Sequence, residues 1–562
     1  MKARTRLRTK VSQEMMQLRR VAGGVAMSKR ALASGAAAST KARGLSPTHR
    51  SAYRADFKSE GPREIELKLQ FPLGSRAILE GSGAFSGVKA RQFHQVTTYF
   101  DTSESLLDAA GYTLRVRRSG NSRIQNVKSV GSRCGVAESR SEWEWVIRQD
   151  VPDVKRLAEI QELTDIALAI KGRLEPVFVT DIRRTTRLLP LDADTIVEAA
   201  IDEGSIEAKG LQEPVAELEL ELKGGPIGPL YRLAAELQAT TPLWISPESK
   251  SARGWRLRTG QTGEAQHSQP PELGRHIRAA DGLHEIICGT LGHLMANIGP
   301  TLCGSTEGLH QMRIALRESR AALKLFDRYL DAVTAERFSA GLQRFGRIFG
   351  IARDWDVFCL ETLPAAMEKL PRQRLRDLVP VAESKRQIAR AAVMNALRSQ
   401  EFTALVLGLA SWAEVGRAQP SIFGDRMGKR LRPLAPSLLD LVACRAKKRG
   451  RHAGRHSVEE WHQLRKSLKK LCSDVVCFSG LYPRRTVNAY KGRCEDLLAV
   501  LGVANDAVVM QRLAPQLATD NRPDLAKPAG ALVQWGERQV HKDLKALKGA
   551  QKRFSATLPF WS

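Results

Sequence analysis

Short segments between about residues 62 and 260 alternate charged and apolar side chains with a period of two. In the stretch 63–69, Glu64, Glu66 and Lys68 occupy every second position between apolar residues. This spacing predicts a β-strand with one charged face and one apolar face. A single strand of this kind is most simply explained as a surface strand whose charged face meets water.

Further segments repeat this alternation, so a simple surface strand no longer explains the pattern. The segments that alternate or are rich in strand-forming residues are 97–102, 112–117, 125–128, 140–145, 180–189, 196–201 and 217–223. We interpret residues 202–204 as a turn that ends the apolar strand 196–201. Helices predicted near 157–170 and 230–237 could cover the apolar faces. A closed antiparallel barrel with polar contents and helices outside satisfies both faces of every strand.

Side chains of both signs would then share the interior of the barrel. The carboxylates are Glu64, Glu66, Glu142, Glu144, Glu217, Glu219 and Glu221, and the cations are Lys68, Arg115, Arg117, Lys128, Arg140 and Arg184. Cations hold phosphate oxygens, and carboxylates hold hard divalent metals. The interior therefore suits a phosphate chain bound together with metal ions.

Seven motifs in this region resemble, in order, those of the CYTH family of triphosphate tunnel metalloenzymes. They are Glu64-x-Glu66-x-Lys68, Tyr99-Phe100-Asp101-Thr102, Leu114-Arg115-Val116-Arg117, Arg140-x-Glu142-x-Glu144, Asp202-x-Gly204, Glu217-x-Glu219-x-Glu221 and Ser249-Lys250-x-x-Arg253. The resemblance implies an α+β domain over residues 59–258, built on an eight-stranded antiparallel β-tunnel.

The same resemblance implies roles for individual side chains and a need for Mg²⁺ or Mn²⁺. Catalytic roles are expected for Glu64, Glu66 and Lys68. Metal ligands are expected at Glu64, Glu66, Glu142, Glu144, Asp202, Glu217 and Glu219. Triphosphate contacts are expected from Lys68, Arg115, Arg117, Lys128, Arg140, Arg184, Lys250 and Arg253. Arg183 and Arg187 compete with Arg184 for one of these positions.

The pattern changes after a Gly, Gln, Ser and Pro rich stretch, residues 259–274, which we interpret as a linker. Beyond it, apolar residues follow helical spacing. His310-x-x-Arg313-x-x-x-Arg317 recurs as His462-x-x-Arg465-x-x-x-Lys469, an offset of 152 residues. The repeat predicts an all-α pseudo-symmetric pair of helical bundles, at about 275–430 and 431–556.

Each repeat also carries a stripe of basic side chains along one helix. On the first helix the stripe is His310, Arg313, Arg317, Arg320 and Lys324, within an arc of about 80°. On the second helix it is His462, Arg465, Lys466 and Lys469. One basic stripe is usually a solvated surface, but two related stripes would frame a surface suited to an extended polyanion.

This repeat, followed by Gly350-x-x-Arg353-Asp354-x-Asp356, resembles the CHAD family of conserved-histidine α-helical domains over residues 275–556. The resemblance implies binding of inorganic polyphosphate by the two stripes. Asp354 and Asp356 leave two interpretations open: ion pairs that orient neighbouring arginines, or metal ligands. Together the two resemblances are those of bacterial CYTH-CHAD inorganic triphosphatases.

Composition narrows the choice of partner. The net charge of +28 predicts an acidic partner, and a length of 562 residues allows several domains. Residues 1–54 hold 13 Lys or Arg and one acidic residue. We therefore interpret residues 1–58 as a disordered basic tail, or as an incorrectly assigned start of a protein that truly begins at Met27. The eight cysteines show no paired spacing, which favours reduced thiols in the cytoplasm. The sequence contains no run of about 18 apolar residues, so no membrane-spanning helix is predicted.

Three classes of function remain open from the sequence. The first is metal-dependent hydrolysis of inorganic triphosphate with polyphosphate binding, and the same tunnel motif would also serve a nucleotide or thiamine triphosphatase or an adenylate cyclase. The second is a non-catalytic polyphosphate-binding or granule-associated protein. The third is a nucleic-acid binder, which is disfavoured because aromatic residues are only 6% and no recognition motif is present.

Overall fold

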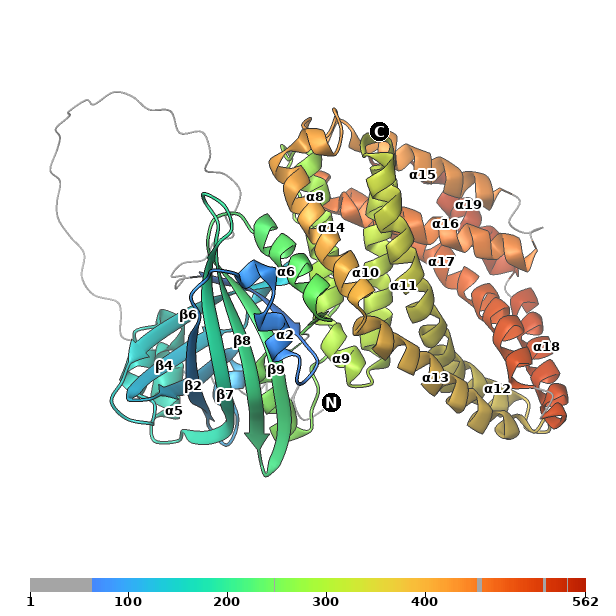
Figure 1. The fold of residues 1–562 in the computed structure, drawn as a ribbon. Coiled ribbons are helices and arrows are strands. Elements are labelled where there is room, and N and C mark those ends of the chain that lie inside the picture. The colour runs from blue at the N-terminus through green and yellow to red at the C-terminus, as the bar shows by residue number, and fades with distance from the viewer. Residues whose placement is uncertain (1–62, 247, 452–456, 519–521, 543, 562) are drawn as a thin grey trace, which may run out of the picture.

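The computed structural model of the protein describes residues 63–246, 248–451, 457–518, 522–542 and 544–561. A β-barrel forms the first part of the described chain, and a helical domain lies beside it (Figure 1). The segment 1–58, predicted to be a basic tail or a misplaced start, lies outside the described residues.

The barrel contains eight long antiparallel strands and two short additions. The strands are β1 Arg63–Gln70, β2 Arg91–Asp101, β3 Tyr112–Ser119, β4 Ser122–Ser129, β5 Ser132–Cys134, β6 Ala137–Val146, β7 Glu175–Pro190, β8 Ile196–Ala208, β9 Leu211–Gly224 and β10 Trp244–Ile245. Their order is β10-β1-β9-β8-β7-β2-β3-β4-β6-β5, and β1 also pairs with β6. This last pairing closes the barrel, so the predicted eight-stranded antiparallel tunnel is confirmed.

Strand register places opposite charges directly across from one another inside the barrel. Lys68 of β1 lies opposite Glu219 of β9, and Arg184 of β7 lies opposite Asp202 of β8. Directly opposed charges of unlike sign stabilise a given register of two strands. The alternation read from the sequence therefore helps to fix how the strands pair as well as which face turns inward.

The predicted turn at residues 202–204 is wrong, because β8 continues through these residues to Ala208. Gly204 pairs with β7, and a Cβ atom at this position would lie 1.9 Å from the carbonyl oxygen of Asp181. Glycine is needed here for close backbone approach within a strand and does not mark a turn.

Helices cover the outside of the barrel and one of its ends. They are α2 Arg76–Glu80, α3 Leu106–Ala109, α4 Val154–Leu157, α5 Thr164–Ile170, α6 Gly228–Thr240 and α7 Lys250–Thr259. Leu67, Leu218 and Leu220 on the outer face are at most 1% exposed and share a core with Leu230 and Leu237 of α6. Each such side chain contributes about 2 kcal/mol through burial. The outer faces of β3 and β4 pack similarly on α3, α4 and α5.

Helix α7 lies across one end of the barrel. Phe178 of β7 lies on the same inward face as Thr180 and Arg184, which line the interior. A Cβ atom added to Gly254 of α7 would approach the Phe178 ring to 2.3 Å, so the glycine lets the helix press against this ring. The helix therefore plugs the end of the barrel at which Phe178 lies.

The helical domain follows the linker. Its helices are α8 Ala279–Ala296, α9 Ile298–Leu302, α10 Thr306–Leu325, α11 Ala332–Val357, α12 Leu363–Lys369, α13 Val379–Leu397, α14 Gln400–Ala418, α15 Ala435–Gly450, α16 Val458–Cys477, α17 Arg484–Leu513, α18 Ala526–Lys542 and α19 Leu544–Ala556. Helix α14 packs on α6 of the barrel domain (Figure 1), and Gln238 and Gln400 exchange amide hydrogen bonds there.

Helix boundaries repeat with the offset of 152 residues found in the sequence. Helix α10 begins and ends 152 residues before α16, and α11 begins 152 residues before α17. The serines that cap α10 and α16, Ser305 and Ser457, keep the same offset. Phe326 and Phe478, also 152 apart, touch edge to face with ring centroids 5.8 Å apart. The predicted pseudo-symmetric helical pair is thus present in the fold.

Among the described residues, one helical stretch, Arg484–Leu517, is long and apolar enough to span a membrane by length and hydropathy alone. The sequence analysis predicted no such stretch. Tyr490, Cys494 and Leu497 of this segment lie in the core of the helical domain.

Candidate functional site

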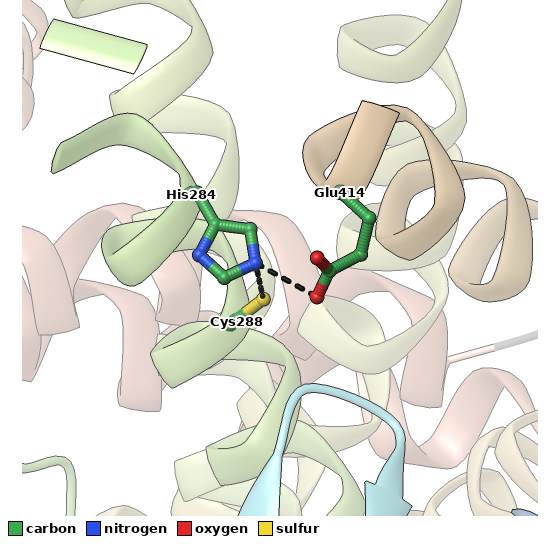
Figure 2. A group of neighbouring side chains, drawn as sticks. All are labelled: His284, Cys288 and Glu414. Atoms are coloured by element: carbon green, nitrogen blue, oxygen red, sulfur yellow. Dashed lines mark hydrogen bonds and ion pairs between the residues drawn. The ribbon is translucent and has the colours of Figure 1, made fainter. Parts of the chain in front are cut away.

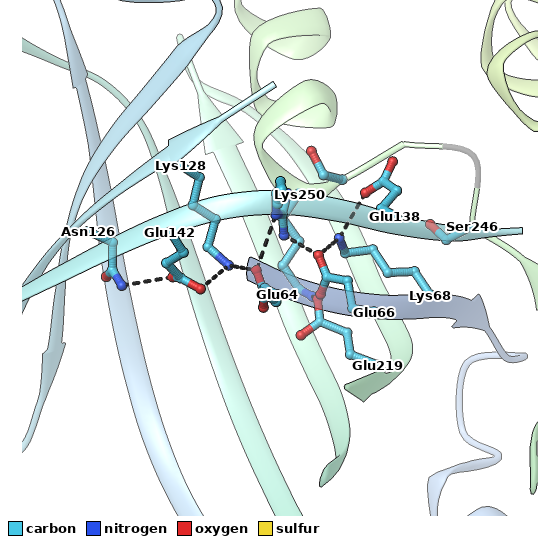
Figure 3. Close-up of polar contacts among 12 residues, drawn as sticks. Glu64, Glu66, Lys68, Asn126, Lys128, Glu138, Glu142, Glu219, Ser246 and Lys250 are labelled. Atoms are coloured by element: carbon cyan, nitrogen blue, oxygen red, sulfur yellow. Dashed lines mark hydrogen bonds and ion pairs between the residues drawn. The ribbon is translucent and has the colours of Figure 1, made fainter. Parts of the chain in front are cut away.

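A cavity of about 860 Å³ runs through the barrel, and charged side chains of both signs line it (Figure 3). The predicted site residues that line it are Glu64, Glu66, Lys68, Arg115, Arg117, Lys128, Arg140, Glu142, Glu144, Arg184, Glu219 and Lys250. The structure therefore brings together side chains from β1, β3, β4, β6, β7, β9 and α7, which are up to 186 positions apart in the sequence.

Carboxylates and cations of the lining pair with one another. Lys128 Nζ lies 2.7 Å from Glu64 and 2.9 Å from Glu142, and Arg140 contacts both Glu64 and Glu66. Burial alone would raise the pKa of Glu142, but Lys128 and Arg115 overcome this and lower it to about 2. The carboxylate is therefore ionised throughout the physiological range.

Arg117 differs from the other cations of the cavity. No carboxylate contacts its guanidinium among the described residues, and its Nε is buried without a hydrogen-bond partner. Burial, together with repulsion from Arg115 and Arg184, lowers the pKa of Arg117 to about 10. An anion in the cavity would relieve this repulsion and complete the hydrogen bonding of the guanidinium.

The plugged end of the cavity is held by Lys250 of α7. Its Nζ lies 2.6 Å from Glu217, 2.9 Å from Asp202 and 2.9 Å from Glu219. Burial would lower the pKa of Lys250, but the three carboxylates raise it well above its usual value. The ammonium group remains charged and points from the helix toward the interior of the barrel.

Three predicted site residues do not line the cavity. Asp202 and Glu217 are fully buried beneath Lys250, and Arg253 pairs with Glu213 and Glu217 at 2.7 Å each. Their contacts are those of a network that anchors α7 in the barrel. The predicted roles of these three in metal or phosphate binding stay predictions.

The structure distinguishes the three neighbouring arginines of β7. Arg184 lines the cavity, where its guanidinium binds Asp202 at 2.5 Å and Glu219 at 2.6 Å. Arg183 is 76% exposed, and Arg187 stacks over the Phe85 ring outside the barrel. Arg184 is therefore the arginine that faces the interior.

Two carboxylates that the predicted metal set omitted lie beside Glu64. Glu198 and Glu221 line the cavity and are opposed on β8 and β9. Burial and the nearby charges of Glu64 and Glu198 raise the pKa of Glu221, despite its contact with Lys223. Mutual repulsion among buried carboxylates is the property of a site that favours a cation.

The oxygen donors of this group fit Mg²⁺ or Mn²⁺, which prefer carboxylate ligands. Glu64, Glu66, Glu198 and Glu221 would hold such an ion. The alternation along β9 predicted that Glu221 faces inward. It did not predict Glu198, because this is the one charged residue in the apolar run 196–201. Glu138 also lines the cavity and extends the alternation of β6 by one step.

A second cavity, about 1390 Å³, forms a groove in the helical domain between α10, α11, α15, α16 and α17. All nine residues of the two predicted stripes line it: His310, Arg313, Arg317, Arg320, Lys324, His462, Arg465, Lys466 and Lys469. The lining includes 13 Lys or Arg against four Asp or Glu. The two stripes therefore meet in a single groove, which we call the basic groove.

Cations from neighbouring helices extend the basic groove beyond the stripes. Arg347 and Arg353 reach it from α11, Arg445 from α15 and Arg512 from α17. Arg353 belongs to the motif quoted above, whereas Arg347, Arg445 and Arg512 have no distinctive spacing with the stripes, because the packing of separate helices brings them there. Burial and the charges of Arg353 and Arg317 lower the pKa of His310 to about 4, so His310 is neutral at pH 7.

Asp354 and Asp356 form ion pairs, as the first of their two interpretations predicted. Asp354 contacts Arg313 at 3.0 Å and also contacts Arg512. Asp356 is fully buried and binds Arg386 at 2.8 Å and Arg390 at 2.9 Å. Asp354 thereby holds one arginine from each repeat at the edge of the basic groove.

Two family models match the chain. The CYTH domain model matches residues 62–255, and the CHAD domain model matches residues 285–515. An inorganic triphosphatase of Haemophilus influenzae is 28% identical over 210 residues, which cover 35% of this chain and 56% of the relative. The match thus spans only about half of the length of that relative.

Solved structures are also similar to parts of the chain. The CHAD domain from the plant Ricinus communis covers 53% of this chain and 98% of its own length, with 24% identity and a TM-score of 0.46. HpAC1 from Hippeastrum is described as a putative adenylyl cyclase with a dominant triphosphatase activity. It covers 35% of this chain and 96% of its own length, with 20% identity and a TM-score of 0.27. PptA from Streptomyces chartreusis covers 49% of this chain and 100% of its own length, with 17% identity and a TM-score of 0.39.

Proposed function

Because the chain joins a CYTH domain to a CHAD domain, we propose that it hydrolyses inorganic triphosphate in the barrel with Mg²⁺ or Mn²⁺ and binds inorganic polyphosphate along the basic groove. The observation that carries the first part is the closed barrel whose cavity holds facing cations and carboxylates. The curated relative named inorganic triphosphatase supports the choice of substrate.

The residues of the cavity suit binding and orientation of a phosphate chain. Arg117 offers a guanidinium with no carboxylate partner among the described residues, and Arg115 and Arg184 add positive charge beside it. Lys250 places a further ammonium group in the cavity, beside Glu219. When bound, the divalent ion would neutralise phosphate charge and activate water.

Release of phosphate from tripolyphosphate tests this proposal. We expect the purified protein to release phosphate with Mg²⁺ or Mn²⁺ and to lose this activity in excess chelator, because without a cation the carboxylates repel the anionic substrate. ATP and thiamine triphosphate assayed alongside would rank the substrates. Hydrolysis of ATP above tripolyphosphate would contradict the inorganic substrate, and no hydrolysis of any triphosphate would leave a binding protein.

Polyphosphate binding is supported by the charge and the length of the basic groove. Contributions from both repeats mean that one extended anion would contact both halves at once. No Phe, Tyr or Trp is among the described residues that line the groove, so ionic contacts with a phosphate polymer suit it better than stacking of bases. Association with polyphosphate granules would follow from such binding.

Polyphosphate affinity should fall as the pH rises from 7 to 9.5. Burial and the neighbouring charges of Arg465 and Arg317 lower the pKa of Lys469 to about 8. A bound polyanion favours the charged amine and raises this pKa, so above pH 8 binding must first protonate Lys469. Titrations of labelled polyphosphate at constant ionic strength measure the effect. Lys469→Arg should flatten the fall, because arginine stays charged; an equal fall in this variant would contradict the assignment.

A further inference from the structure

A buried cluster of a histidine, a cysteine and a glutamate lies in the helical domain where it meets the barrel (Figure 2). His284 and Cys288 are one turn apart on α8, and Glu414 faces them from α14. None of the three is more than 8% exposed. Neither the tunnel nor the basic groove includes them, so the proposed function does not account for their chemistry.

The three side chains point their donor atoms at one another. His284 Nε2 lies 2.8 Å from Glu414 Oε1 and 3.3 Å from Cys288 Sγ, and the three donor atoms lie within 4.8 Å of one another. Tetrahedral Zn²⁺ with bonds of about 2.0–2.3 Å would separate N from S by about 3.6 Å and N from O by about 3.3 Å. To seat an ion, the distances from Nε2 to Oε1 and to Sγ would have to lengthen by about 0.3–0.5 Å, and Sγ and Oε1 would have to lie about 3.6 Å apart.

One nitrogen of the imidazole, Nε2, faces both of the other donor atoms of the cluster. A protonated imidazole offers one N–H on its Nε2 side, but both the carboxylate and the sulfur lie there. The other ring nitrogen, Nδ1, is buried 3.5 Å from the carboxylate of Glu285. Metal-binding histidines usually direct this second N–H toward a carboxylate or carbonyl, which is the orientation seen here.

We propose that His284, Cys288 and Glu414 bind one Zn²⁺ ion at the junction of the two domains. Thiolate and imidazole ligands favour Zn²⁺ over Mg²⁺ and Mn²⁺, whereas the carboxylates of the tunnel favour the harder ions. The described residues add no fourth side chain to the group, so water would complete the tetrahedron. Cys288 is in no disulfide, so its sulfur keeps the thiol chemistry of a zinc ligand.

The barrel domain covers this cluster from two sides. A Cβ atom on Gly135, in the turn between β5 and β6, would lie 3.5 Å from Cys288 Sγ. A Cβ atom on Gly228, at the start of α6, would lie 3.9 Å from Glu414 Cβ. An ion that fixes α8 to α14 would therefore also fix the surface on which the barrel rests.

Titration of the full-length protein with Co²⁺ tests the proposal. Protein purified under reducing conditions and stripped with a chelator should bind one equivalent of Co²⁺ with a sulfur-to-cobalt absorption band, which Zn²⁺ abolishes and Mg²⁺ does not. Tunnel carboxylates cannot produce this band. Cys288→Ala and His284→Ala should lose or strongly weaken it, whereas Cys303→Ala, at an exposed cysteine, should retain it.

The wild-type titration decides the question even if a variant does not fold. Absence of the sulfur-to-cobalt band in wild type, or its retention in folded Cys288→Ala, would overturn the proposal. All these readouts are independent of hydrolysis, so they stand whether or not the tunnel is catalytic.

Discussion

Alanine at Glu66 should lower the rate of tripolyphosphate hydrolysis by about 100-fold or more, and alanine at Glu64 should do the same. Loss of residues that merely orient a metal ligand costs about 10- to 100-fold, so loss of a ligand should cost at least as much. The change also leaves Arg140 with one carboxylate fewer in the cavity. Phosphate release at saturating Mg²⁺ or Mn²⁺ measures the effect.

Folding must be separated from chemistry in this experiment, because a buried cation without its partner destabilises a protein. Glu66→Gln keeps the shape of the side chain and removes its charge, so it should also be inactive while unfolding near the wild-type temperature. Glu236→Ala, at an exposed glutamate of α6, is the matched control and should keep full activity. Wild-type turnover in both Glu64→Ala and Glu66→Ala would rule out the tunnel mechanism.

Replacing Arg313, Arg317, Arg465 and Lys469 together by alanine should reduce polyphosphate affinity by more than about 100-fold. Each charged hydrogen bond to phosphate contributes about 1.5–3 kcal/mol, and the four side chains come from both repeats of the basic groove. The dependence of log affinity on log salt should also become shallower by about 3, since four phosphate contacts are lost. Titrations of full-length protein at several salt concentrations measure both.

A fourfold control should remove the same charge elsewhere. Arg372, Arg398, Lys429 and Lys552 are exposed and lie outside the basic groove, so their joint replacement by alanine should leave affinity within about twofold. Full affinity in the groove variant would mean that polyphosphate binds to basic surface in general and not to the basic groove. Displacement by single-stranded nucleic acid at equal phosphate concentration should be weak; equal displacement would restore the nucleic-acid hypothesis.

Much of the barrel could be predicted because its interior is polar. Charged residues at every second position, as in β1 and β9, leave only one side on which apolar residues can be buried, so the inward face follows from the sequence. The run 202–204 misled because Asp and Gly usually mark turns. Here Gly204 allows the close approach of β7, which depends on a strand about 20 residues earlier.

Parts of the candidate sites could not be predicted for a similar reason, because residues far apart in the sequence form them. Stripes on single helices, such as Arg313 and Arg317 on α10, follow from helical spacing, but Arg445 and Arg512 join them only through packing. Arg253 has the motif position of a substrate contact, yet it lies beneath the cavity because α7 enters the barrel end. Glu414 lies 130 residues from its partner His284, and no local pattern connects them.

The contact between Phe326 and Phe478 has a consequence for how the helical domain is assembled. Equivalent residues touch each other where a rotation axis passes between them, and these two rings are equivalent under the 152-residue offset. Such a contact is the kind found at the centre of an isologous dimer, here formed within one chain. Because both halves belong to one chain, the two sides of the shared groove can diverge independently.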